Sequence, residues 1–337
     1  MELEQAFLIL RPPIEEELKA VVLDSISDEY PVLREMMGYH MGWEGEGAGP
    51  KTQGKRLRPI LLLLSTVAAG ADWEQALPAA AGVELLHNFS LIHDDVEDNG
   101  DLRRGRPTVW VKWGVSQAIN AGDLMFTISN QAILKLKKSY SAEVVLRAQE
   151  LFQQTCVKLT QGQYLDMWYE KLNELPLDAY WSMVAGKTAA LLACCTELGA
   201  LLGGADSKMC GKYHQFGHLL GLAFQAQDDL LGIWGDVEKI GKSTSSDLYT
   251  KKKTLPVIYG LQQNGKFAEK WLSGEPKLEE VPEMALLLED EGAREFTKQM
   301  AFDLTKKAQD ALEEVVGGHQ TGVALRQLTE KLIGRQS

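Results

Sequence analysis

The sequence is poor in cysteine and forms none of the usual cysteine motifs. Its 337 residues include four cysteines, at positions 156, 194, 195 and 210, with no Cys-x-x-Cys pair among them. This spacing argues against a disulfide scaffold and against a zinc site. We therefore expect the protein to work in a reducing compartment, the cytoplasm.

The chain also lacks an excess of positive charge and a long hydrophobic run. It has 35 basic and 47 acidic residues, a formal net charge of −12. Nucleic acids and anionic membranes attract positive surfaces, so we expect neither as a partner. The longest apolar stretch, at 60–71, is shorter than the roughly 20 residues of a membrane span. Glu2 and Glu4 stand where a secretory leader has basic residues, so we expect a protein that is neither exported nor integral to a membrane.

Proline is absent from three long segments, 108–175, 177–255 and 283–337, so helices can run through them without interruption. Apolar residues there recur at helical spacing, as at Leu304, Ala308 and Leu312. No segment shows a convincing strand alternation. We predict an all-α chain that forms a single domain over 1–337, with 283–337 as its C-terminal helices.

The first group of chemically informative residues lies in ELLHNFSLIHDDVEDNGDLRRGRPT, at 84–108. On a helix, Asp94 and Asp98 lie one turn and about 40° apart, so both carboxylates point the same way. With Asp95 beside them they form an oxygen-rich cluster that suits Mg²⁺. Arginines follow directly, and carboxylates, a metal and arginine together can hold a diphosphate. An isolated acidic helix end could equally be a solvated face.

A second cluster weakens that plainer interpretation, because the pattern recurs. FQAQDDLLGIWGD at 224–236 contains Asp228 and Asp229 after an apolar helical run, and lysines follow at 242 and 251–253. A third basic segment, GKRLRP at 54–59, precedes a run of leucines. Two helices that each bring carboxylates and then cations are suited to binding one polyanion.

The ordered set GKRLRP, LLHNFSLIHDDVED, LRRGRPT, AGD, GQYLD, GKTAALL, FQAQDDLLG and GKSTSSDL…KKKTLP resembles the trans-isoprenyl diphosphate synthases, or polyprenyl synthetases. The resemblance is strongest over 50–256. It implies a single all-helical domain of about ten or more helices around a deep central cavity, usually a homodimer, with three Mg²⁺ ions. It also implies a prenyltransferase that joins isopentenyl diphosphate to an allylic diphosphate.

Residue roles follow from the same resemblance. Metal ligands would be Asp94, Asp98 and Asp228, supported by Asp95 and Asp229. The allylic diphosphate would be held by Arg103, Lys187, Lys242 and Lys252. The pocket for isopentenyl diphosphate would contain Gly54, Lys55, Arg58, His87 and Arg104. Thr188 and Gln225 would face the developing carbocation, and Gln163 and Asp166 would line the same cavity.

The sequence departs from the family pattern at the end of the second motif, where Gly232 replaces the usual third aspartate. Product length depends in the family on the residues four and five positions before the first motif, here Ser90 and Phe89. One aromatic with a small neighbour is most like the producers of the C20 geranylgeranyl chain. A farnesyl product or a longer chain stays open.

Two other functions are also open. A class I terpene cyclase shares the fold and the first motif, and its second motif has metal ligands at the spacing of Asp228, Gly232 and Asp236. A non-catalytic partner subunit of a synthase would be expected to have lost its aspartates. Outside these motifs, His214 and His218 are four residues apart with no third metal ligand in view, so we expect them simply to share a helix face.

Overall fold

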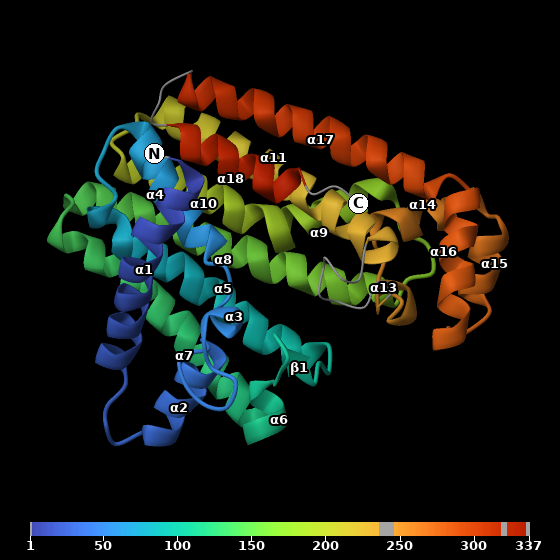
Figure 1. Cartoon of the computed structure of the whole chain (residues 1–337), viewed down its shortest axis with the longest axis horizontal. Helices are drawn as coiled ribbons and strands as arrows, with labels where there is room; N and C mark the ends of the chain where they lie inside the picture. Colours follow the sequence, from blue (N-terminus) through green and yellow to red (C-terminus); the bar gives the residue numbers. More distant parts are fainter. Residues whose placement is uncertain (1, 236–245, 318–321, 335–337) are drawn as a thin grey trace. The chain divides into compact units, whose positions relative to one another are not determined.

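The computed structural model describes residues 2–235, 246–317 and 322–334 (Figure 1). Within these ranges the regular secondary structure is helical except for two strands of two residues each, β1 (Leu102–Arg103) and β2 (Arg106–Pro107). The all-α prediction is confirmed. The chain forms two compact units: unit 1 comprises Met1–Gln154, Cys195–Cys210 and His319–Leu325, and unit 2 comprises Thr155–Cys194, Gly211–Gly318 and Arg326–Ser337.

Unit 1 contains the helices of the N-terminal half. They are α1 (Leu3–Ser25), α2 (Pro31–His40), α3 (Pro50–Gln53), α4 (Leu57–Ala69), η1 (Glu74–Ala76), α5 (Leu77–Glu97), α6 (Val109–Trp113), α7 (Val115–Leu134) and η2 (Lys135–Lys138). Four further helices have residues in both units: α8 (Ala142–Glu170), α10 (Ala190–Leu202), α11 (Ser207–Trp234) and α18 (Val323–Ile333).

Helix α5 is the centre of unit 1 and packs against α1, α4 and most extensively α7. Its first half is buried on all sides because it is built from alanine, glycine, valine and leucine. Gly82 and Gly122 let α5 and α7 approach closely: a Cβ atom at Gly122 would lie 2.1 Å from Nε2 of His93. The buried half of α5 fixes the position of its acidic C-terminal end.

A buried ion-pair network joins α1 to α5 through Arg56. Arg56 is 2% exposed, and its Nε and Nη1 atoms donate to Glu15 at 2.6 Å and to Glu84 at 2.8 Å. Its Nη2 atom also donates to the backbone oxygen of Met41 at 3.4 Å. Arg56 therefore finds its anions inside the protein, unlike the other basic residues of GKRLRP.

Unit 2 contains α9 (Leu177–Val184), η3 (Ala185–Ala189), α13 (Ser246–Tyr249), α14 (Leu255–Gln263), α15 (Lys266–Leu272), η4 (Leu278–Glu280), α16 (Val281–Asp290) and α17 (Ala293–Val316). Helix α14 packs against α9, α15 and α17. A buried cluster that includes Val257, Phe267, Trp271 and Leu288 fills the space among the shorter helices. Pro256 at the first turn of α14 costs no hydrogen bond there.

One helical stretch, Leu177–Leu202, is long and apolar enough to cross a membrane by length and composition. Core helices pass the same test, and 72% of its apolar window is buried inside the protein. The short hairpin β1–β2 was not predicted, since no segment of the sequence shows a convincing strand alternation.

Replacing Arg56 with alanine should lower the free energy of unfolding by about 3–5 kcal/mol, because it leaves two buried carboxylates without their cation. Urea denaturation followed by circular dichroism measures this. Arg147→Ala is the matched control, since its ion pairs involve a half-exposed guanidinium and should contribute at most about 1 kcal/mol. An unchanged unfolding midpoint for Arg56→Ala would contradict the assigned role.

Candidate active site

The first acidic cluster lies where α5 ends. Asp94 is half-buried in the last turn, and Asp98 is exposed at the C-cap, where its backbone N–H donates to the Asp94 carbonyl oxygen at 2.8 Å. As predicted, the helix runs through Asp94. It ends at Glu97, so Asp98 caps the helix. The carboxylate of Asp94 is thus partly open to solvent, and that of Asp98 is exposed.

Asp95 has a different surrounding from Asp94. It is 5% exposed, and Nε of Arg103 donates to both of its oxygens, at 2.9 and 2.8 Å. Burial raises the pKa of Asp95, while Arg103 favours its charged form. Asp95 thus anchors Arg103 beside the exposed carboxylates.

The β1–β2 hairpin places Arg103 and Arg104. Its turn residues Arg104 and Gly105 have φ of 53° and 75°, as a two-residue hairpin of the primed type requires. Arg104 donates through Nη1 to the Thr52 backbone oxygen at 2.7 Å. Gly54 is needed here, because a Cβ atom would lie 2.9 Å from Nη2 of Arg104 and the φ of Gly54 is +82°.

Arg58 and His87 form a half-buried basic pair. Nη1 of Arg58 lies 3.1 Å from Nε2 of His87, and since arginine can only donate, that ring nitrogen is the acceptor. Burial, and then Arg58, lower the pKa of His87 well below its usual value. Nε of Arg58 is buried without a hydrogen-bond partner among the described residues. Lys55, by contrast, is exposed.

His40, at the end of α2, is a residue that the sequence interpretation missed. It shares a small cavity with Arg103, Arg104 and Asp95. Its Nε2 atom is buried with no hydrogen-bond partner within the described ranges. Burial, and then Arg103 and Arg104, lower its pKa well below the usual value. No motif signals this residue, because α2 is far from the others in sequence. Unit 1 thus holds buried or half-buried basic groups that a bound anion would stabilise.

In unit 2, Asp229 is the centre of a hydrogen-bond network. It is 3% exposed; Oδ1 accepts from Gln225 at 2.8 Å, and Oδ2 accepts from the Tyr180 hydroxyl and the Leu255 N–H, both at 2.7 Å. Burial raises its pKa to about 7 despite these donors. Asp228, the other member of the pair, is exposed. Each aspartate pair therefore has one anchored and one accessible carboxylate.

The network continues to the residues expected near the carbocation. The Oγ1 hydroxyl of Thr188 donates to Oε1 of Gln225 at 2.8 Å, so both ends of the Gln225 amide are fixed. Lys187 forms an ion pair with Asp166 of α8. Gln163 lies half-buried one turn before Asp166 on the same helix.

Lys187 and Thr188 lie in η3, a turn of π-helix, a form that often occurs at functional sites. Its position depends on close packing against α8. A Cβ atom at Gly162 would lie 2.1 Å from the backbone nitrogen of Lys187, and one at Gly186 would lie 2.8 Å from the Lys158 carbonyl oxygen. Gly162 belongs to the GQYLD motif, but its packing role was not predicted.

The structure also bears on the missing third aspartate of the second motif. A Cβ atom at Gly232 would lie 2.5 Å from Oδ2 of Asp247. The carboxylate of Asp247 thus lies where a side chain at 232 would begin. Lys252 is half-buried and donates its backbone N–H to the Asp247 carbonyl oxygen at 2.9 Å. Lys242 and Asp236 lie outside the described residues.

The donor set fits Mg²⁺ that is completed by substrate. Among the described residues no three His, Cys, Asp or Glu side chains come close enough to hold an ion by themselves. Mg²⁺ is typically bound by one or two carboxylates together with waters and substrate phosphates. Asp94 with Asp98, and Asp228, are accessible carboxylates of that kind.

Phe89 and Ser90, the residues expected to limit product length, lie on α5 one to two turns before Asp94. The Phe89 ring packs against Phe126 of α7 with ring centroids 5.1 Å apart and against His93 at 5.0 Å. The Ser90 hydroxyl donates to the His87 carbonyl oxygen at 2.9 Å. Phe126 was not predicted.

Comparison with known proteins agrees with these features. The sequence model of the Polyprenyl synthetase family matches residues 49–287. The chain belongs to this family. It is 36% identical over 317 residues to a (2E,6E)-farnesyl diphosphate synthase of Mycobacterium tuberculosis, covering 91% of this chain and 87% of that one. It is 43% identical over 238 residues to a geranylgeranyl diphosphate synthase of the same species, covering 70% and 67%.

Solved structures of this family have the same fold as the chain. A geranylgeranyl pyrophosphate synthetase of Pyrococcus horikoshii superposes with a TM-score of 0.88 at 30% identity, covering 99% of both chains. A polyprenyl synthetase of Streptomyces coelicolor gives a TM-score of 0.85 at 35% identity, covering 98% of both. The predicted family, fold and reaction class are confirmed: the chain is a trans-prenyl diphosphate synthase.

Gly162→Ala should lower activity and stability together, because the new methyl group would press on the π-helical turn that carries Lys187. Overpacking of this kind costs about 1–3 kcal/mol, and we expect a fall in kcat of at least tenfold. Thermal unfolding and steady-state kinetics measure the two effects. Gly211→Ala on α11 is the control, since nothing lies within 4 Å of its Cβ position. This variant should lower neither kcat nor thermal stability. Normal kcat in Gly162→Ala would contradict the packing argument.

Proposed function

We propose that this enzyme condenses isopentenyl diphosphate with an allylic diphosphate to give all-trans geranylgeranyl diphosphate. The observation that carries the proposal is the group of half-buried basic residues in unit 1, His40, Arg58, His87 and Arg104, beside the accessible carboxylates of α5. Nε2 of His40 and Nε of Arg58 are themselves buried without a hydrogen-bond partner among the described residues. A bound anion would give these groups the partner that they lack.

We assign isopentenyl diphosphate to Arg58, His87 and Arg104, with Lys55 and the Gly54 backbone N–H at the rim. A terpene cyclase would have no use for this second diphosphate site. A non-catalytic partner subunit would not need the intact aspartates. Both alternatives therefore rank below chain elongation.

We assign the allylic diphosphate to Asp94 and Asp98 through Mg²⁺, and to Arg103, Lys187, Lys242 and Lys252 directly. Asp228 would hold the third of three ions, with Asp229 orienting Gln225 and Asp247 contributing the carboxylate that Gly232 lacks. When bound, Mg²⁺ neutralises the charge that develops on the leaving group.

The protein's own groups then act in sequence. Cations at Arg103 and Lys187 hold the departing diphosphate while the allylic C–O bond ionises. The fixed oxygens of Thr188 and Gln225 face the carbocation. The double bond of isopentenyl diphosphate attacks that cation to form the new C–C bond. The departing diphosphate takes the proton that is lost, leaving a chain one isoprene unit longer.

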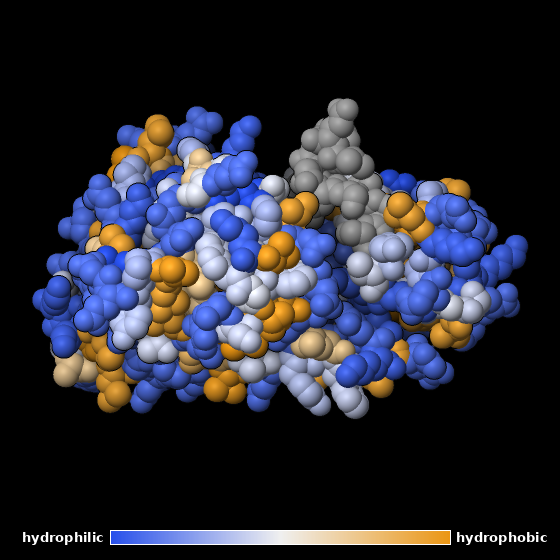
Figure 2. All heavy atoms as spheres, turned by 90° about the horizontal axis from the view of Figure 1, so that it is seen from below, coloured by the Kyte–Doolittle hydropathy of each residue, from blue (hydrophilic) through white to orange (hydrophobic). Residues whose placement is uncertain are grey.

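We further propose a cytoplasmic homodimer in which the whole chain, 1–337, works as one domain. The family match spans residues of both units. Val157, Tyr164 and Trp168 of α8 share one helix face and are 56%, 62% and 47% exposed, as an interface between copies would require. On the face drawn in Figure 2, hydrophobic side chains form small groups among hydrophilic ones.

Purified protein with Mg²⁺ and labelled isopentenyl diphosphate should extend dimethylallyl, geranyl and farnesyl diphosphates, and the dephosphorylated product should run as geranylgeraniol. Chromatography of the prenols measures this. Asp94→Ala should lower the rate by at least about 100-fold, in line with the loss of one charge-stabilising group. Cyclic hydrocarbon made from an allylic substrate alone would support the cyclase instead, and no product with any starter would support the partner subunit.

Phe89→Ala should lengthen the product, because it removes the ring that packs against Phe126 of α7 one to two turns before Asp94. The same assay measures the shift toward longer prenols. Phe126→Ala should act in the same direction, and Phe302→Ala, which removes an exposed ring on α17, serves as the control. If Phe89→Ala and Phe126→Ala both leave the product length unchanged, these two rings do not determine chain length.

A further inference from the structure

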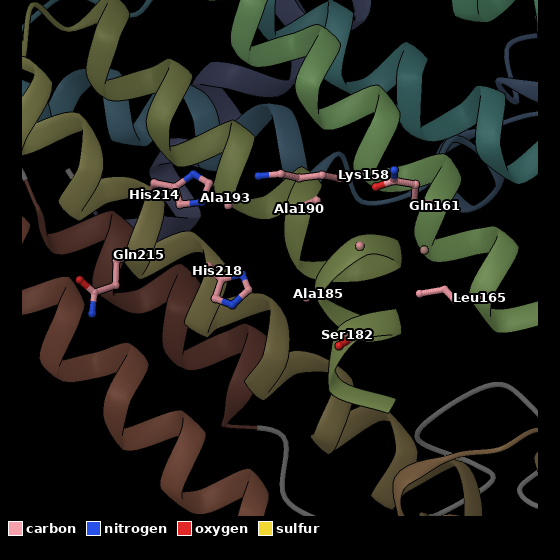
Figure 3. A pocket seen from close by; sticks show the side chains of 12 residues that line it. Lys158, Gln161, Leu165, Ser182, Ala185, Ala190, Ala193, His214, Gln215 and His218 are labelled. Atoms are coloured by element: carbon pink, nitrogen blue, oxygen red, sulfur yellow. The ribbon is translucent and has the colours of Figure 1, made fainter. Parts of the chain in front are cut away.

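Unit 2 has a groove that none of the assigned roles uses. It is lined by residues of α8, of α9 through α10, and of α11, and it has a volume of about 450 Å³ (Figure 3). Lys187, Thr188 and Gln225 are not among its lining residues. Cavities of about 300–1,000 Å³ are the usual size for small-molecule sites.

The floor of the groove is made of small residues. Gly162 and Gly186 bring the α8 and η3 backbones together, and Ala185, Ala190 and Ala193 follow along the floor. Such residues leave a smooth apolar trough with no side chain to fill it. Leu165 of α8 extends the apolar surface at one end. A flexible aliphatic chain fits a floor of this kind better than a polar ring system.

The walls are basic in an otherwise acidic protein. No aspartate or glutamate lines the groove, although the chain as a whole has a net charge of −12. Lys158 on α8 extends its side chain over the floor (Figure 3) and forms no ion pair within the described residues. His214 and His218 stand on α11 with nearly parallel rings, 6.5 Å between centroids.

Basic groups on the two walls of the groove affect the pKa of His218. Burial, and then His214 and Lys158, lower the pKa of His218. A negatively charged group between these side chains would pair with the Lys158 ammonium and accept hydrogen bonds from the imidazole N–H groups. A metal ion is a poorer occupant, because only two imidazoles and no carboxylate line the site.

We propose that this groove binds an amphiphile, with an aliphatic chain on the small-residue floor and an anionic head between Lys158 and the two histidines. Two kinds of molecule share this chemistry: a long-chain carboxylate, and a prenyl diphosphate such as the proposed product. The inference goes beyond the proposed function and does not depend on turnover.

Equilibrium dialysis with labelled palmitate and labelled geranylgeranyl diphosphate, in EDTA, tests the proposal without metal-dependent binding or catalysis. At least one probe should bind, and Lys158→Glu should weaken its binding at least tenfold. Ser182→Trp should weaken it similarly by filling the groove, since Ser182 is an exposed lining residue. Lys307→Glu changes the net charge equally on an exposed part of α17 and should leave binding unchanged.

The two probes distinguish a carboxylate head group from a diphosphate head group. The probe whose binding is weakened by Lys158→Glu is the one that the groove accepts. Circular dichroism of all three variants should match the unaltered enzyme, and so should the initial rates of Lys158→Glu and Lys307→Glu without amphiphile. The proposal is overturned if neither probe binds, or if binding is the same in Lys158→Glu as in the unaltered protein. A failed product assay alone would overturn the proposed function and leave this result intact.

Discussion

The structure depends on how it places two negative charges side by side. Adjacent carboxylates on one helix repel each other, and burying either without partners is costly. In both clusters the second aspartate is buried and held by internal donors, Asp95 by Arg103 and Asp229 by Tyr180, Gln225 and the Leu255 N–H. That arrangement leaves the first aspartate accessible while its helix is fixed, which is what a metal ligand requires.

In the basic segment GKRLRP the order is reversed: the first arginine is anchored inside the protein and the second is not. Arg56 is neutralised inside the protein by Glu15 and Glu84 and holds α1 to α5. Arg58, two residues later, lies half-buried next to His87, and its Nε atom has no hydrogen-bond partner in the part of the chain that the structure describes. Two arginines of one motif therefore have different roles: Arg56 is structural, and Arg58 is suited to an external anion. Composition cannot separate them, because the distinction rests on which carboxylates the fold brings near.

Much of the fold and of the candidate site could be predicted from the sequence, and physical reasons explain why the other parts could not. The proline-free segments and periodic apolar residues predicted the helices, and the ordered motifs predicted the family. The hairpin was missed because its turn uses Arg104 at positive φ, where asparagine is usual. Tyr180 and His40 were missed because they reach the site from distant segments. The role of Asp247 at Gly232 depends on a contact that no spacing rule contains.

The segment Ala185–Ala190 shows why the proposed reaction site and the groove are linked by one constraint. Gly162 and Gly186 must lie in contact for the π-helical turn to fit against α8. One face of the turn then carries Lys187 to Asp166 and Thr188 to Gln225. Its other residues, Ala185, Gly186 and Ala190, stay small and form the groove floor. An occupant of the groove would press on the same short turn that orients Lys187, so binding there is expected to couple to catalysis through backbone packing and without contact with substrate.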